Sequence, residues 1–202
     1  MKEAIRREAE RSDSNINFVL THSINGGTGS GLAYDLLREM SDSSPKGQRC
    51  SMSVFPSPNI SSLMVEPYNS VMASSELVEY CTMIIPVTNE KIYDVSDKKF
   101  SADVSFESYH LINELIVRVL STLTCSMRFP TQQVTGSFRD IPINLIPFRK
   151  LNTLIPSFSF SKKKLCSVES STMDCFDRGN WLTSVNPMGG KHIGCGMFYR
   201  GP

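Results

Sequence analysis

A glycine-rich segment is the part of this sequence best suited to chemistry. It runs Asn25, Gly26, Gly27, Thr28, Gly29, Ser30 and Gly31, between an apolar run and a helical pattern. A turn from a strand into a helix supplies free backbone N–H groups and the positive end of the helix dipole, and both attract phosphate. Glycines also let the backbone approach a ligand closely. The residues themselves leave two interpretations open, a phosphate-binding loop and a flexible turn.

The glycine spacing differs from the two best-known phosphate motifs. No Lys follows Gly31, as the P-loop of nucleoside triphosphatases requires. The third glycine of a dinucleotide fingerprint would stand one residue later than Gly31 does. The segment therefore does not by itself indicate which phosphate compound would bind.

The elements around this segment favour an α/β fold. Apolar runs predict strands at residues 16–21, 50–55, 83–87 and 192–199. Helical patterns are expected at residues 1–11, after the glycines, and at residues 106–127, which give the longest helical signal. The helix after the glycines should bury Leu32, Leu36, Leu37 and Met40. A strand, a glycine turn and a helix in succession indicate a parallel sheet with crossover helices.

Composition excludes several classes of partner. The chain has 202 residues, 40% of them hydrophobic and 20% charged, which is typical of a globular protein. Its net charge of +1 gives no basic excess for nucleic acid or an anionic membrane. No apolar run reaches the ~18 residues of a membrane helix, and residues 1–8 lack the apolar core of a signal peptide. A soluble, intracellular protein is expected.

The six cysteines indicate no metal site. They are scattered, with no C-x-x-C pair and no His at ligand spacing. Reduced, mostly buried thiols are the expected state.

Several short segments of the sequence resemble segments of beta-tubulin and occur in the same order. They span almost the whole chain, at residues 8–13, 20–23 with the glycines, 54–58, 65–69, 89–94, 124–130, 144–148 and 198–201. The chain therefore resembles a divergent tubulin of the beta type. The resemblance covers only the middle of a tubulin and implies a fragment lacking the N- and C-terminal regions. It implies that residues 1–105 form the second half of the nucleotide-binding domain, 106–128 its central helix, and 129–202 the beginning of an incomplete intermediate domain.

The resemblance also implies a GTP or GDP site. By match, the phosphate contacts are Ser23, Gly26, Gly27, Thr28 and Gly29. Glu66 matches the carboxylate near the ribose, while Asn89, Tyr109 and Asn113 match the residues that bind and stack on guanine. Asn25 stands where the family has glycine. The alternative is that Tyr109 is a buried aromatic and the two asparagines cap helices.

Asp140 stands where alpha-type tubulins carry a glutamate that acts in hydrolysis on the next subunit. It could orient water, or it could form a helix-capping pair with Ser137. The capping interpretation is preferred, and Pro142 interrupts the helix expected there. No catalytic residue is therefore assigned, and whether the chain is an enzyme stays open.

Two functions follow from the resemblance. The first is a GTP-binding structural subunit of microtubules in the cytoplasm, which polymerises with an alpha-type partner when full length and could bind microtubule-associated proteins. Mg²⁺ is implied by the family, but its ligands are not expected in this chain.

The second function is a truncated, non-polymerising relative with little GTP binding. Asn25, Pro142 and a short lateral-contact loop at residues 161–166 support it. The resemblance also implies an unpaired sheet edge and weak GTP affinity for this chain alone. A free-standing nucleotide enzyme is a third and least favoured hypothesis, because no complete catalytic set is present.

Overall fold

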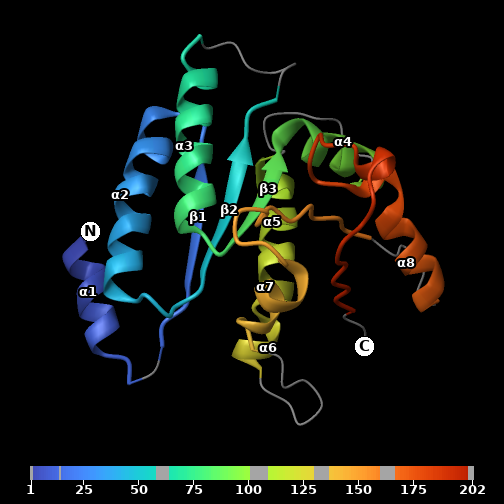
Figure 1. The fold of residues 1–202 in the computed structure, drawn as a ribbon. Coiled ribbons are helices and arrows are strands. Elements are labelled where there is room, and N and C mark those ends of the chain that lie inside the picture. Colours follow the sequence, from blue (N-terminus) through green and yellow to red (C-terminus); the bar gives the residue numbers. More distant parts are fainter. Residues whose placement is uncertain are drawn as a thin grey trace.

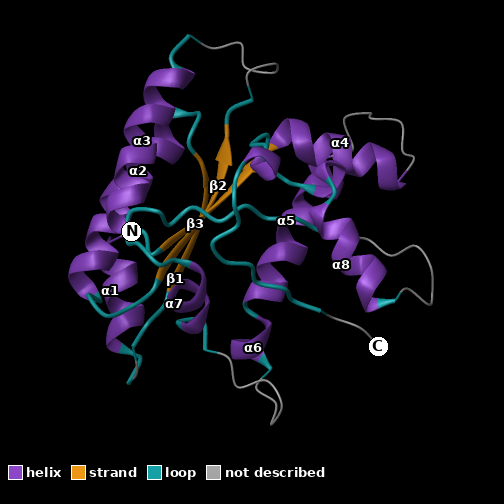
Figure 2. Ribbon diagram, turned by 45° about the vertical axis from the view of Figure 1, so that its right-hand side comes forward, coloured by secondary structure: helices purple, strands orange, loops and turns teal. Residues whose placement is uncertain are grey.

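Three parallel strands form the centre of the computed structural model, which describes residues 2–13, 15–57, 64–100, 109–129, 137–159 and 167–199. The strands are β1 (Phe18–Ser23), β2 (Arg49–Phe55) and β3 (Met83–Thr88), in the order β1-β2-β3. Helices lie on both sides of the sheet (Figures 1 and 2). The predicted parallel α/β sheet with flanking helices is confirmed.

The strands agree with the apolar runs except at their ends. β1 begins two residues later than the run at residues 16–21 and continues to Ser23. β2 and β3 each differ from the prediction by one residue at one end. All six residues of β3 are buried, because helices cover both faces of the sheet.

Two helices cover one face of the sheet. They are α2 (Gly27–Ser43) and α3 (Glu66–Tyr80), and α1 (Lys2–Glu10) lies beside α2. Their apolar residues form a core cluster with the strands: Ile24, Leu37, Ala73, Leu77, Cys81 and Ile84. The predicted apolar face of α2 is right for Leu36, Leu37 and Met40 but wrong for Leu32, which is 41% exposed. Ala33 takes the place on the buried face that was expected for Leu32.

The other face carries α4 (Asn89–Phe100), α5 (Tyr109–Leu123) and α7 (Asp140–Leu145). Ile92, Ile112 and Leu115 pack with Val87 of β3 in one cluster. Phe138, just before α7, is 1% exposed and packs with Met52 of β2 in another.

The long helix expected at residues 106–127 is interrupted. α5 ends at Leu123, and a separate short helix, α6 (Cys125–Arg128), follows Thr124. The Thr124 hydroxyl donates to the Leu120 carbonyl at 2.9 Å, and Thr124 has φ −93° and ψ 0°. A Thr side chain bonded four residues back competes with the helical ladder and bends the helix. Residues 106–108 lie outside the described residues.

A buried arginine closes the opposite end of the sheet from the glycine turn. Arg49 is 7% exposed. Its Nε donates to the Tyr80 carbonyl at 2.7 Å, and its Nη1 donates to the carbonyls of Ser44 and Gly47, both at 3.2 Å. These carbonyls lie at or just after the ends of α3 and α2, where helical C=O groups lack partners. One guanidinium therefore caps both helices, although burial lowers its pKa.

The chain after α7 returns to the outer side of β3. The Ile84 N–H donates to the Asn152 carbonyl, and the Leu154 N–H donates to the Ile84 carbonyl, each at 2.8 Å. The Asn152 side chain, fully buried, donates to the Cys81 carbonyl at 2.8 Å. Beyond this point come α8 (Val168–Phe176), η2 (Arg178–Asn180) and η3 (Pro187–Gly189).

The strand predicted at residues 192–199 is wrong. These residues are exposed and have no ladder partner in the part of the chain that the structure describes. Gly194 and Gly196 lie against Leu145, and glycines weaken a strand that has no neighbour to pair with. The lateral-contact loop at residues 161–166 lies outside the described residues.

No described helix has both the length and the apolar character that crossing a membrane requires. The described cysteines differ in exposure: Cys50 and Cys81 are buried, Cys125 and Cys175 are half-buried, and Cys195 is exposed. The expectation of mostly buried thiols thus holds for two of these. Burial raises the pKa of Cys50 and of Cys81 to about 12.

We expect Cys50 and Cys81 to resist a maleimide at pH 8 in the native protein, because a buried thiol with a high pKa gives almost no thiolate. Cys195 should react first. Peptide mass spectrometry after timed labelling measures each site, and labelling in denaturant serves as the control. Equal native rates at Cys50 and Cys195 would contradict the packing described.

Candidate functional site

The predicted site residues gather along one edge of the sheet. Ser23 ends β1, Gly26 and Gly27 begin the turn into α2, Glu66 is the first residue of α3, and Asn89 is the first residue of α4. The strands' carboxyl ends and the starts of these helices lie along the same edge, the upper one in Figure 1. Ligands of parallel α/β sheets bind at this edge.

The start of α2 is open to a ligand. Gly26 is its N-cap residue, with φ −87° and ψ 155°, and no side chain caps the helix. Gly26, Gly27 and Thr28 are exposed, and a Cβ added at Gly26 or Gly27 would meet nothing within 4 Å. The first N–H groups of a helix have no partner inside it. An anion such as phosphate therefore fits this turn.

Gly29 has a different role from the glycines before it. A Cβ at Gly29 would lie 2.2 Å from the Ser23 carbonyl oxygen and 3.2 Å from its carbon. Only a glycine permits this approach of α2 to β1. The structure thus gives Gly29 a packing function beside the phosphate contact that the sequence predicts for it.

A histidine lies beneath this turn. His22 Nδ1 is 2.8 Å from the Gly29 carbonyl, and Nε2 is 3.1 Å from Ser51 Oγ and 3.0 Å from Ser53 Oγ. Burial is the main cause that lowers the His22 pKa, and hydrogen bonds to the backbone of Gly29 and Ser23 oppose it. Sequence reasoning missed this cluster. The available signal was polar residues at alternate positions of β2, where a buried strand is otherwise apolar.

Asn25 connects the glycine turn to α3. Its carbonyl accepts a hydrogen bond from Asn69 Nδ2 at 3.1 Å, and its N–H donates to Ser23 Oγ at 3.4 Å. Its own side-chain oxygen is buried and has no hydrogen-bond partner among the described residues. Such an acceptor costs about 1–3 kcal/mol. The Asn25 side chain is therefore an unfavourable feature of this turn.

A second unpredicted contact joins the loop after β2 to the first turn of α4 at the same edge. Ser57, 5% exposed, follows β2 and donates a hydrogen bond from its hydroxyl to the carboxylate of Glu90 in α4. It fixes the start of α4 relative to the end of β2.

The predicted guanine-binding residues lie on α4 and α5. Asn89 is half-buried at the first position of α4, which suits a ligand contact, whereas the cap position before the helix belongs to Thr88. Asn113 is exposed on α5, one turn after Tyr109, whose side chain lies outside the described part. Ile112 and Leu115, on either side of Asn113 along the helix, are buried in the cluster that joins α5 to α4 and β3.

Asp140 takes part in a capping arrangement. Its carboxylate accepts the Ser137 N–H at 2.7 Å, and Ser137 Oγ accepts the Arg139 N–H at 3.4 Å. The predicted pairing of Ser137 with Asp140 in the first turn of α7 is therefore present, but the N-cap residue is Arg139, and no side chain caps the helix. Pro142 lies in the first turn of α7 and is buried. A proline is tolerated there because its missing N–H has no helical partner, so the expected interruption does not occur.

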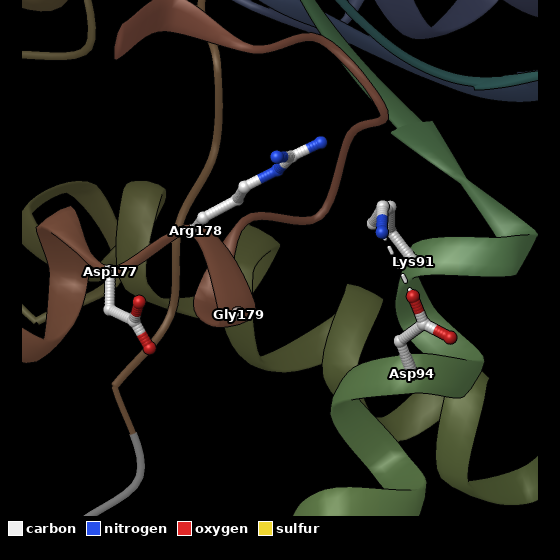
Figure 3. A pocket seen from close by; sticks show the side chains of 5 residues that line it. All are labelled: Lys91, Asp94, Asp177, Arg178 and Gly179. Carbon is white, nitrogen blue, oxygen red and sulfur yellow. Dashed lines mark hydrogen bonds and ion pairs between the residues drawn. The ribbon is translucent and has the colours of Figure 1, made fainter.

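A separate polar hollow of about 340 Å³ lies between α4 and η2. Lys91, Asp94, Asp177, Arg178 and Gly179 line it (Figure 3), and Lys91 Nζ donates to Asp94 at 2.9 Å. Two acids and two bases leave it without a net charge, so it favours neither anions nor cations. In the part of the chain described, no three His, Cys, Asp or Glu side chains come together as a metal site would require.

Comparison with known proteins agrees with this geometry. Residues 1–97 match the model of the Tubulin/FtsZ family, GTPase domain. The chain is 34% identical over 203 residues to the tubulin beta-2 chain of Suillus bovinus, covering 98% of this chain and 45% of that protein. It is 36% identical over 204 residues to the tubulin alpha chain of Dictyostelium discoideum, covering 98% and 44%. The chain thus spans less than half the length of these relatives, and it matches alpha and beta chains about equally.

Replacement of Gly29 tests the close approach of α2 to β1. We expect Gly29→Ala to lower the free energy of unfolding by about 1–3 kcal/mol, because its Cβ forces backbone to move. Gly31→Ala is the matched control: Gly31 is exposed inside α2, with nothing within 4 Å of the added Cβ, and should stabilise by about 0.5–1 kcal/mol. Urea unfolding followed by circular dichroism measures both. Equal effects would contradict the packing role.

Proposed function

Because this chain belongs to the tubulin family, we propose that it binds GTP or GDP at the carboxyl edge of its sheet and assembles with other tubulin subunits. The observation that carries the proposal is the uncapped start of α2. Its exposed glycines lie at the same edge as Glu66 and Asn89. Phosphates on that turn would leave the rest of the nucleotide to extend towards α4 and α5.

The residues on these elements suit a guanine nucleotide. The amides of Asn89 and Asn113 can both donate and accept hydrogen bonds, as the O6 acceptor and N–H donors of guanine require. Tyr109 would stack on the base, an interaction of about 1–3 kcal/mol. Glu66 would accept hydrogen bonds from the ribose hydroxyls. Ser23, Gly26, Gly27, Thr28 and Gly29 would surround the phosphates.

The finer assignment is a beta-like subunit. It would pair with an alpha-type tubulin and act in cytoplasmic microtubules, with microtubule-associated proteins as further partners. GTP hydrolysis would be completed between subunits. No catalytic residue is assigned, since Asp140 already accepts the Ser137 N–H. The resemblance implies Mg²⁺ with the nucleotide and places its ligands outside this chain, so no Mg²⁺ ligand is assigned here.

One observation favours a second candidate, a non-polymerising relative with little GTP binding. Asn25 replaces the family's glycine in the phosphate turn, and its side-chain oxygen is buried without a hydrogen-bond partner among the described residues. A turn altered in this way would bind phosphate less well than a turn with glycine at this position.

Nucleotide titration tests the guanine site. We expect Asn113→Ala and Asn89→Ala each to weaken binding of a fluorescent GTP analogue about five- to tenfold, since each loses about 1 kcal/mol of hydrogen bonding. Asn144→Ala, an exposed asparagine in α7, is the matched control and should leave affinity unchanged. Displacement by ATP as readily as by GTP would contradict a guanine site. A wild-type chain with no measurable binding would favour the second candidate.

Sedimentation separates the two candidates at the level of assembly. We expect the chain to pellet with microtubules polymerised in GTP, because tubulin surfaces would offer it a lattice position. An unrelated protein of similar mass controls for trapping in the pellet. Recovery of the chain only in the supernatant would leave the non-polymerising relative as the working function.

A further inference from the structure

His22 is the polar side chain that joins the phosphate turn to the sheet. It lies on β1 directly before Ser23, two residues after Leu20, and therefore faces the same side of the sheet as Leu20. Leu20 packs against the cluster beneath α2 and α3. The imidazole is thus enclosed between the sheet and the first turn of α2, and it contacts Gly29 there.

The partners of His22 decide which of its ring nitrogens donates and which accepts. The Gly29 carbonyl can only accept, so Nδ1 must carry the proton and donate it. In the neutral ring Nε2 is then an acceptor. A serine hydroxyl donates to it, from Ser51 at 3.1 Å or Ser53 at 3.0 Å. The two hydroxyls are 2.6 Å apart, so one donates to the other.

The serines make this chain of hydrogen bonds rigid. Both are fully buried, at 0% exposure, on neighbouring positions of the same face of β2. Whichever serine donates to Nε2, the imidazole keeps one orientation, because turning the ring away leaves a buried polar group unpaired. The orientation of the imidazole is therefore set by β2 and transmitted to the Gly29 carbonyl.

Gly29 is held from two sides. Its Cα lies too close to the Ser23 carbonyl for any side chain, and its carbonyl accepts the imidazole proton. The residues just before it, Gly27 and Thr28, carry the exposed N–H groups of the uncapped helix start. Loss of the restraint at Gly29 would let these groups fray.

We propose that His22, supported by Ser51 and Ser53, is a positioning residue that fixes the first turn of α2 for binding nucleotide phosphates. The inference rests on the proposed function, of which it specifies one part. His22 does not contact the phosphates; it acts through the Gly29 carbonyl. Burial lowers the pKa of His22, which favours the neutral ring that this hydrogen-bond direction requires.

Two amide variants separate positioning from general structure. In His22→Asn the amide nitrogen takes the place of Nδ1 and can donate to Gly29. In His22→Gln the longer side chain places its amide near the position of Nε2, so it reaches the serines and not Gly29. We expect His22→Gln to weaken binding of the fluorescent GTP analogue about tenfold, the range of one lost hydrogen bond to a binding element. His22→Asn should stay within about twofold of wild type.

Thermal melting of each variant shows that it is folded. Equal loss of affinity in both variants, or none in either, overturns the proposal. The wild-type imidazole gives a further check by nuclear magnetic resonance, because the ¹⁵N shifts report which nitrogen is protonated. A proton on Nδ1 is expected, and a neutral ring protonated on Nε2 overturns the proposal.

Hydrogen exchange of the backbone amides tests the role of His22 without any nucleotide. If the wild-type chain does not bind the GTP analogue, the proposed function fails, and exchange alone decides the role of His22. Faster exchange of the Ser30 to Ala33 amides in His22→Gln, but not in His22→Asn, supports positioning of the turn. Unchanged exchange in both variants overturns it.

Discussion

The first turn of α2 lies so close to the end of β1 that position 29 can carry no side chain, and much of the structure depends on this contact. Gly29 allows it, at 2.2 Å between a would-be Cβ and the Ser23 carbonyl oxygen. The contact directs α2 back along the sheet, where Leu36, Leu37 and Met40 are buried. It also leaves Gly26 and Gly27 exposed at the edge. One steric constraint therefore sets both a packed helix and an open anion site.

The two ends of the sheet differ in how the polar groups at the helix ends are satisfied. At the carboxyl edge, helix N–H groups are left without side-chain caps and are available to a ligand. At the other edge, Arg49 and Asn152 satisfy the carbonyls at the ends of α2 and α3 from within the protein. A buried guanidinium is costly to desolvate unless each of its hydrogen bonds is made. On the structural side these carbonyls are satisfied, although the side-chain oxygen of Asn152 is buried and has no partner among the described residues. On the side proposed to bind nucleotide, the helix N–H groups are left open.

Sequence patterns predicted the features of this fold that depend on residues close together in the chain. Strand runs, the glycine turn and the apolar face of α2 follow from periodicity within a few residues, and Ser137 with Asp140 follows from capping chemistry. Contacts between distant segments did not follow. The contact of His22 with Ser51 depends on the register of β1 and β2. The contact of Ser57 with Glu90 depends on how the loop after β2 lies against the start of α4. The missing strand at residues 192–199 has the same origin, since tertiary partners decide whether a local tendency is realised. The break at Thr124 is local instead, because its hydroxyl bonds to the Leu120 carbonyl four residues back.

Pro86 hinders the addition of a further strand along the outer edge of β3. Ile84 and Thr88, two residues to either side, both donate their N–H groups away from β2, to Asn152 at 2.8 Å and to Leu182 at 2.9 Å. The nitrogen of Pro86 faces the same way and has no proton to give. An incoming strand would find an interrupted row of donors along β3. Along β1, the described residues supply no neighbour at the far edge. Recruitment of any additional strand, native or not, would therefore be one-sided and would begin at β1.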